Sequence, residues 1–179
     1  ERSMAIHVSS CDVGDATDTS ALLACAALTG VLHAAGVLYD KMLRWMASGD
    51  VQASFAPKAL AASHVQAIVM CLPHEAFGLF SSIASTFGNV GQANYAAANA
   101  YLDALAWSCR LRGTLSSSLQ IPGVTDAGMG ALTFDKAKLS TLGAISLDTF
   151  VACLAVSLAR GRSALEQTQA PLAPTLLQS

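Results

Sequence analysis

Short apolar runs bounded by glycine, proline and small polar residues recur along the chain, and longer segments with apolar residues every three or four positions lie between them. The short runs predict strands and the longer segments predict helices. The predicted strands are residues 4–9, 31–33, 76–82 and 117–121, and the predicted helices are residues 19–28, 51–70, 94–112 and 147–159. Strands that alternate with helices are typical of a doubly wound parallel sheet, so we expect an α/β fold with its site at the carboxyl ends of the strands.

The helix expected over residues 94–112 has the clearest apolar pattern. The stripe that we expect to be buried is Ala98, Leu102, Leu105 and Cys109. Pro57 interrupts the helix of residues 51–70 near its start. Residues 122–138 are rich in glycine and are expected to form a mobile loop. Residues 161–179 hold three glutamines and two prolines, so we expect a partial domain over residues 1–160 followed by a linker or a frayed last strand.

Composition narrows the class of protein. The chain has 179 residues, of which 53% are hydrophobic and 12% charged, which suits one domain with a large core. A net charge of −2 gives no basic surface, so a nucleic-acid partner is not expected. The five cysteines include no CxxC pair, so we expect free thiols in a reducing compartment and no metal site.

The uncharged run over residues 19–39 is long enough to cross a membrane. It contains His33, Gly30 and Gly36, however, and divides naturally into a helix, a turn and a buried strand. We therefore expect no membrane span. The chain opens on Glu1 and Arg2 without a signal peptide, so we expect it to be cut from a longer protein.

Four polar residues form the candidate active site: Lys58, Ser82, Tyr95 and Asn99. A phenol titrates near 10, so a tyrosine that donates a proton at neutral pH needs a nearby cation, and Lys58 is the candidate. The Ser82 hydroxyl, at the end of a strand, can hydrogen-bond a carbonyl oxygen on which charge develops. Tyr95 and Asn99 are four residues apart and share a helix face. Each residue alone has an ordinary structural explanation, but the combination predicts a reductase.

These motifs resemble the ketoreductase domains of modular polyketide synthases, a branch of the short-chain dehydrogenase/reductases. The pattern there is a strand ending in FSS, a GxxGQxNYxAAN segment and an upstream PK pair, which residues 80–82, 88–99 and 57–58 match in that order. The lysine precedes the serine by 24 positions and the serine precedes the tyrosine by 13, as in that family. The resemblance implies a Rossmann-like fold.

The resemblance also implies roles for the four residues. Tyr95 is the expected proton donor, and Ser82 holds the substrate oxygen. Lys58 is expected to lower the pKa of Tyr95, and Asn99 to orient a water or backbone group that relays the replacement proton. Asp103 is expected to be an ordinary solvated carboxylate.

Cofactor contacts are implied by the same resemblance. They are Asp12 and Val13 near the adenine, His33, Ala34, Ala35 and Gly36 under the ribose, and Pro122, Gly123 and Val124 along the nicotinamide. Asp12 has the alternative role of a turn former, and His33 is interpreted as a packed histidine and not as a proton carrier. No G-x-G-x-x-G follows a strand, so the first βαβ unit is expected to lie outside this chain and this piece to bind cofactor poorly alone. NADPH is implied by the family only.

Candidate substrate and stereocontrol residues are Asp40, Phe87, Gln92 and Met129. Leu38 and Asp40 keep the first and last residues of an LDD triplet that marks one stereochemical type, and Phe87 stands where the alternative type has tryptophan. The expected product is therefore a D-configured hydroxyl. The lid contacts differ from the family pattern, because residues 120–124 replace a WGxW-like stretch.

The implied function is NADPH-dependent reduction of a 3-ketoacyl thioester on an acyl carrier protein, within a cytosolic or plastid polyketide or fatty-acid megasynthase. Other domains of the synthase are expected partners. Two alternatives stay open: a catalytically silent structural remnant of a ketoreductase, and a stand-alone short-chain reductase.

Overall fold

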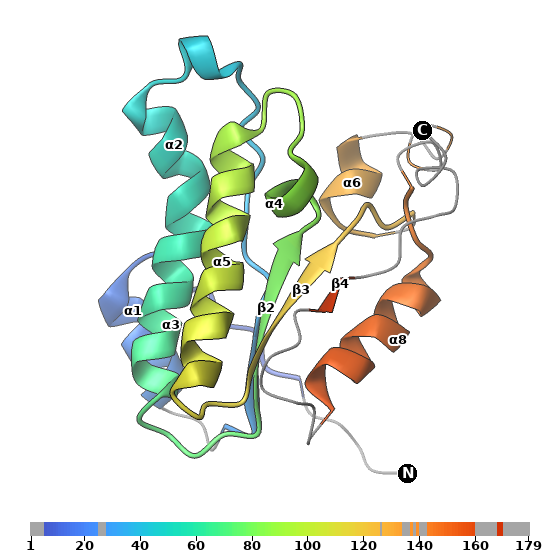
Figure 1. The fold of residues 1–179 in the computed structure, drawn as a ribbon. Coiled ribbons are helices and arrows are strands. Elements are labelled where there is room, and N and C mark those ends of the chain that lie inside the picture. The colour runs from blue at the N-terminus through green and yellow to red at the C-terminus, as the bar shows by residue number, and fades with distance from the viewer. Residues whose placement is uncertain are drawn as a thin grey trace.

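Four parallel strands form the centre of the protein, with helices on both faces (Figure 1). The computed structural model describes residues 6–24, 28–125, 127–133, 137, 139, 143–159 and 168–169. The strands are β1 (Gly30–His33), β2 (Ala76–Ser82), β3 (Ser116–Ile121) and β4 (Thr168–Gln169), in the order β1-β2-β3-β4. The helices α1 (Ala16–Ala24), α2 (Ser48–Phe55), α3 (Ala61–Val69) and α5 (Ala93–Leu111) lie to one side of the sheet, and α8 (Leu147–Leu158) lies on the other. The predicted doubly wound α/β fold is confirmed.

The larger hydrophobic core lies between the sheet and helices α3 and α5. Its members include Phe77 and Leu79 of β2, Val65 and Val69 of α3, and Leu102 of α5. The predicted stripe of α5, Ala98, Leu102, Leu105 and Cys109, is buried throughout. A smaller cluster around Leu119 and Ile145 packs under α8. Burial of one helix stripe on each face fixes the sheet between two layers.

The bounds of the later elements agree closely with the sequence prediction. β2 is observed as predicted, β3 and α8 differ by one residue at one end, and α5 differs by one residue at each end. The expected glycine-rich loop contains a short helix, α6 (Gly128–Thr133), and another, α4 (Ala84–Phe87), follows β2. The predicted mobility of that loop stays untested. β4 lies within the predicted tail, whose residues 161–167 and 170–179 are outside the described part.

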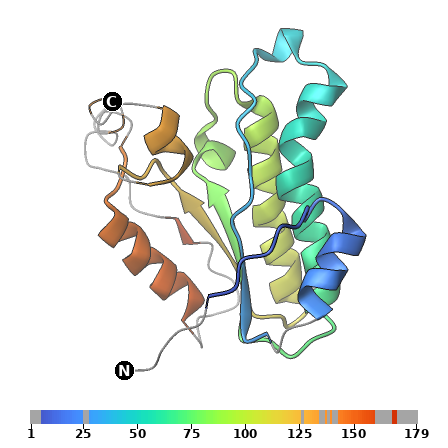
Figure 2. The same cartoon turned by 180° about the vertical axis from the view of Figure 1, so that it is seen from behind.

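The first predicted strand is wrong over residues 6–9. This segment runs as an irregular coil (Figure 2), and Ile6 and Val8 are 78% and 92% exposed. A strand needs a neighbour for its backbone N–H and C=O groups, and no strand of the described residues pairs with this segment. Residues 4–5 lie outside the described part.

The next two elements, α1 and β1, also differ from the prediction, one in its start and the other in its burial. α1 begins three residues before the predicted start, because the Asp15 carboxylate accepts hydrogen bonds from the backbone N–H of Thr17 and Asp18 at 2.8 and 3.0 Å. Residues 25–27 lie outside the described part. β1 is not a fully buried strand as predicted: it lies at an edge of the described sheet, and Leu32 is exposed.

The helix predicted over residues 51–70 consists of α2, a π-helical turn η2 (Ala56–Leu60) and α3. It begins at Ser48, after a loop that holds a short 3-10 turn, η1 (Leu43–Trp45). Pro57 lies inside η2, where the wider turn accommodates its missing N–H group. The turn places the next residue, Lys58, on the buried side, with 3% of its surface exposed.

The uncharged run that raised the question of a membrane span contains the predicted helix and strand, α1 and β1, although β1 is not fully buried. Among the described residues, no helix has both the length and the apolar character needed to cross a membrane.

Candidate active site

A pocket of about 720 Å³ opens at the carboxyl ends of β2 and β3. Lys58, Ser82 and Tyr95 all line it, although they come from η2, β2 and α5. This is the edge of a parallel sheet at which ligands bind in open α/β folds. The structure therefore brings three of the four predicted catalytic residues to one wall.

Lys58 is held in place at both its backbone and its side chain. Its Nζ donates to the carbonyl of Phe80 at 2.9 Å, and its own carbonyl lies 3.0 Å from Nε2 of His33. Burial lowers the pKa of Lys58 to about 8, and the negative charge of Asp103 opposes that shift. The ammonium and the neutral amine of Lys58 are thus both populated near pH 8.

His33 supports Lys58 from below the pocket. It is buried and does not line the cavity. Burial lowers the pKa of His33, so its ring is neutral at pH 7 and Nε2 carries the hydrogen donated to the Lys58 carbonyl. This agrees with the interpretation of His33 as a packed histidine.

Tyr95 lies in the first turn of α5, and its ring centroid is 5.4 Å from Nζ of Lys58. Burial raises the pKa of Tyr95, while the side chains of Asn99 and Ser82 lower it. The net shift is upward because burial is its largest cause, and the Lys58 ammonium is directed at the Phe80 carbonyl. Tyr95 therefore keeps its proton at neutral pH, in the form that a proton donor needs. That Lys58 lowers the pKa of Tyr95 stays a prediction.

Asn99 lies beneath Tyr95 and does not line the pocket. Its side chain is fully buried, and Nδ2 donates to the Tyr95 carbonyl at 2.8 Å. Among the described residues, Oδ1 of Asn99 has no hydrogen-bond partner. Ser82, on the wall itself, accepts a hydrogen bond from the backbone N–H of Ala84 at 3.2 Å, which leaves its hydroxyl hydrogen free to point elsewhere.

The predicted cofactor contacts divide into two groups. Ala34, Gly36, Pro122, Gly123 and Val124 line the pocket, whereas Asp12, Val13, His33 and Ala35 do not. At Gly36, an added Cβ would lie 2.7 Å from Cε of Lys58, so any larger residue there would have to displace the Lys58 side chain. Asp12 instead accepts a hydrogen bond from the Gly14 N–H at 2.9 Å, the arrangement of a turn former.

Three of the four predicted substrate residues line the pocket: Phe87, Gln92 and Met129. Asp40 does not line it, but both carboxylate oxygens accept hydrogen bonds from Nε2 of Gln92, at 3.1 and 3.0 Å. Asp40 therefore acts on the pocket through Gln92. In the described part of the chain, no group of three histidine, cysteine or acidic side chains could hold a metal ion.

Asp103 is not the solvated carboxylate that was predicted. It is half-buried and accepts hydrogen bonds from Ser118 at 2.5 Å, Ser85 at 2.7 Å and Gln120 at 2.8 Å. Ser85 also reaches the carbonyl of Ser82 at 2.8 Å. The signal in the sequence was its position, four residues after Asn99 and eight after Tyr95 on the same helix.

Sequence reasoning also missed Asn94, whose side chain contacts three residues on two other segments, and the apolar wall that Leu147 and Phe150 of α8 supply. Asn94 stands inside the GxxGQxNYxAAN segment next to Tyr95. Nothing in the local pattern shows that an amide there would meet residues about 40 to 55 positions earlier in the chain, because such contacts depend on the fold.

Comparison with protein families shows to which family the chain belongs. The KR domain family matches residues 1–126. This chain belongs to the KR domain family. It is a ketoreductase domain of the kind found in modular polyketide synthases, and its relatives are parts of multidomain polyketide synthases. A relative from Streptomyces halstedii, polyketide synthase GfsA, is 46% identical over 113 residues, or 61% of this chain and 2% of that protein.

Another bacterial relative is the pikromycin polyketide synthase component PikAII of Streptomyces venezuelae, which is 39% identical over 80% of this chain and 4% of its own length. A fungal hybrid PKS-NRPS synthetase, thnA of Trichoderma harzianum, is 38% identical over 66% of this chain and 3% of its own. The chain thus spans only a small part of the relatives it matches.

Solved ketoreductase structures share the fold. One described as an A-type ketoreductase from a modular polyketide synthase superposes with a TM-score of 0.82 and 34% identity, over 92% of this chain and 36% of its own. An A1-type ketoreductase gives a TM-score of 0.82 and 33% identity, over 91% of this chain and 35% of its own. The stereochemical type predicted here from Leu38 and Asp40 stays a prediction.

Proposed function

We propose that the intact domain to which this chain contributes uses NADPH to reduce a 3-ketoacyl thioester, carried by an acyl carrier protein, to the 3-hydroxyacyl thioester. The observation that supports this most is the meeting of Lys58, Ser82 and Tyr95 on one wall of the pocket. These residue types supply a cation, a hydrogen-bond donor and a proton donor, which carbonyl reduction requires. Membership of the KR domain family supports the same chemistry.

The pocket fits the nicotinamide end of a dinucleotide. Ala34, Gly36 and Gly123 present little side-chain bulk, and an added Cβ at Gly123 would lie 3.0 Å from Leu139. A flat ring can approach backbone of this kind closely. When bound, the reduced nicotinamide supplies a hydride. The choice of NADPH over NADH rests on the family resemblance.

Proton transfer is the part that this chain performs. The Ser82 hydroxyl donates a hydrogen bond to the ketone oxygen, and Tyr95 gives that oxygen its proton as negative charge develops on it. The raised pKa of Tyr95 keeps the proton on the phenol until then. Lys58 in its ammonium form stabilises the tyrosinate that remains. Asn99 donates a hydrogen bond to the Tyr95 carbonyl and orients the water or backbone group that returns a proton to Tyr95.

The partners follow from the multidomain context of the relatives. We propose an acyl carrier protein that delivers the substrate on its phosphopantetheine arm, other domains of the same synthase, and a cytoplasmic location. The experiment below tests the alternative of a silent remnant. Sequencing of the flanking chain tests the alternative of a stand-alone reductase.

The test is NADPH oxidation by the full parent domain on a 3-ketoacyl thioester mimic, with identification of the hydroxyl configuration. Tyr95→Phe should lower kcat by about 100-fold or more and leave NADPH binding unchanged. Tyr101→Phe is the matched control: this tyrosine is exposed on the same helix, with its hydroxyl 2.7 Å from Ser63, and should keep the wild-type rate.

Two results would overturn the proposal. A folded parent domain that binds NADPH but reduces no ketone would favour the silent remnant. Equal rates for wild type and Tyr95→Phe would show that another group donates the proton.

A further inference from the structure

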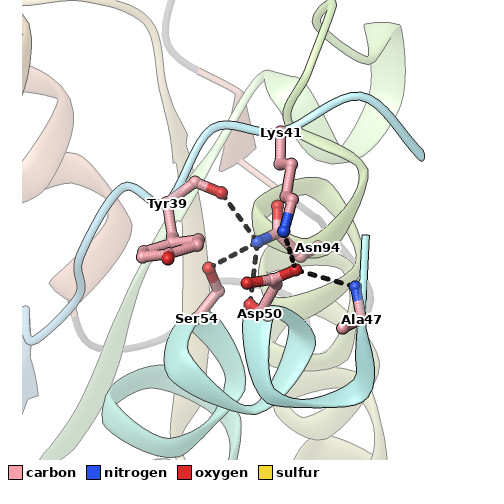
Figure 3. Close-up of polar contacts among 6 residues, drawn as sticks. All are labelled: Tyr39, Lys41, Ala47, Asp50, Ser54 and Asn94. Atoms are coloured by element: carbon pink, nitrogen blue, oxygen red, sulfur yellow. Dashed lines mark hydrogen bonds and ion pairs between the residues drawn. The ribbon is translucent and has the colours of Figure 1, made fainter. Parts of the chain in front are cut away.

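Asn94, the residue before Tyr95, joins its own helix α5 to two segments that are distant in the sequence. Figure 3 shows its side chain between the loop of Tyr39 and Lys41 and the residues of α2. Its Nδ2 donates to the Tyr39 carbonyl at 3.0 Å, the Asp50 carbonyl at 3.1 Å and the Ser54 hydroxyl at 2.9 Å. Asn94 is almost fully buried, so these contacts are made away from bulk water, where their loss is costly.

The other end of the same amide acts on Tyr95 itself. Oδ1 of Asn94 accepts the backbone N–H of Tyr95 at 2.9 Å. The first N–H groups of a helix have no partner within the helix, and a side-chain oxygen that accepts one of them fixes the first turn. One side chain therefore binds both the helix start that carries the phenol and the segments packed against it.

The segments that Asn94 joins are themselves held together. Lys41 forms an ion pair with Asp50 at 2.7 Å, and Asp50 also accepts the Ala47 N–H at 2.7 Å (Figure 3). The backbone N–H of Lys41 donates to the Gly91 carbonyl at 2.7 Å, just before α5. The loop before Lys41 is thus tied both to α2 and to the turn that leads into the catalytic helix.

This loop supplies a wall of the pocket. Gly36 and Leu38 line it directly, and Asp40 holds the side chain of Gln92, which also lines it. Movement of Tyr95 relative to this loop would change both the distance from phenol to substrate and the face that the substrate presents. Misplacement of a reacting group by about 1 Å can cost about 100-fold in rate.

We propose that Asn94 is a positioning residue, which fixes the Tyr95 phenol relative to the loop of Gly36 to Asp40 and thereby sets both the rate of ketone reduction and the configuration of the product. This rests on the proposed function. Asn94 touches neither ketone nor cofactor in this role; it acts through the backbone of Tyr95 and the loop.

The experiment uses the full parent domain with Asn94→Ala, Asn94→Asp and Lys41→Met. Asn94→Asp keeps the oxygen that accepts the Tyr95 N–H but loses both N–H donors. Both Asn94 variants should lower kcat about 10- to 100-fold, leave the KM for NADPH within about twofold, and reduce the diastereomeric purity of the product. Lys41→Met, which removes the ion pair that helps to hold the loop but none of the Asn94 bonds, should lower the rate less than either Asn94 variant. Tyr101→Phe, at an exposed position on the same helix, is the control and should change the rate by less than about twofold.

A second readout does not depend on turnover. In protein labelled at the tyrosine Cζ carbons, the NMR titration of Tyr95 should move in the Asn94 variants, while that of Tyr101 on the same helix should not. If the wild type binds NADPH but reduces no ketone, the proposed function fails, and a moved Tyr95 titration still supports the positioning role. If Asn94→Ala lowers only the melting temperature and leaves kcat, product configuration and the Tyr95 titration unchanged, Asn94 is a structural residue and the inference is overturned.

Discussion

Two polar clusters hold α5, and they differ in charge. Asn94 and Asp103 are nine residues apart, which is two and a half helical turns, so they face opposite sides of the helix. Asn94 is a neutral amide that ties α5 to α2 and the loop before Lys41. Asp103 is a carboxylate that ties it to α4 and β3 through Ser85, Ser118 and Gln120.

The difference shows that polar contacts can hold a helix in position and that a charged contact can also shift the pKa of a nearby residue. The amide matches donors and acceptors with no net charge, so it fixes position without placing a charge beside its neighbours. The carboxylate fixes position as well, but its charge also opposes the lowering of the Lys58 pKa. The neutral amide thus acts on the position of Tyr95, and the carboxylate acts on the pKa of Lys58.

The largest expected effect on stability comes from removal of the charged cluster. Asp103→Ala deprives three buried or half-buried donors of their acceptor, and we expect a loss of about 3 kcal/mol in the free energy of unfolding. Asp103→Asn keeps an acceptor oxygen and should lose less. Urea unfolding of the parent domain measures both. A loss below about 0.5 kcal/mol for Asp103→Ala would mean that water replaces the carboxylate, as at a surface position.

The contrast between the clusters also shows where sequence reasoning succeeded and where it could not. The motif spacing predicted that Tyr95, Ser82 and Lys58 would meet at one edge of the sheet, and all three line the same pocket there. The apolar period of α5 likewise predicted its buried stripe. Patterns of this kind are local and survive in the sequence.

The polar clusters are not local. Asp103 was interpreted as solvated because its partners are a serine on α4 and two residues of β3, which become neighbours only after the sheet forms. The first predicted strand was wrong for a similar reason: its apolar pattern was correct for pairing, but pairing depends on a partner strand. The hydrogen-bond partners of Asp103 and the lack of a partner for residues 6–9 among the described strands both depend on the three-dimensional arrangement of the elements.

The charge difference predicts a smaller, pH-dependent effect. Because the pKa of Lys58 is lowered from 10.5 to about 8, its ammonium is lost as pH rises through 8, and reduction that uses the ammonium should slow there. Asp103→Asn removes the charge that opposes this lowering, so its rate should begin to fall at a lower pH than the wild-type rate. Asn94→Ala, measured in the same pH series of kcat, should lower the rate at every pH without changing the pH at which the rate begins to fall. If the rate of Asp103→Asn began to fall at the same pH as the wild-type rate, the effect of the Asp103 charge on Lys58 would be contradicted.

The same pKa has a consequence for folding. Unfolded Lys58 holds its proton up to pH 10.5, whereas folded Lys58 releases it near 8, so the folded state gains stability as pH rises from about 8 toward 10.5. Lys58→Met should show no such gain. Urea unfolding of both proteins at pH 7.5 and 9.5, values chosen on either side of about 8, measures the difference, and parallel curves would contradict the burial of the charge.

The smallest expected effect comes from one acceptor of the neutral cluster. Asn94 has two amide hydrogens for three oxygens, so Ser54→Ala still leaves two acceptors and should cost less than about 1 kcal/mol. Ser63→Ala, which removes a contact with the exposed Tyr101 and a hydrogen bond to the Ala59 carbonyl within its own helical segment, is the control and should cost less. A double-mutant cycle of Ser54→Ala with Asn94→Ala isolates the shared bond. Coupling well above about 1 kcal/mol would mean that the three acceptors act as one cooperative unit and that the neutral cluster is as tightly built as the charged one.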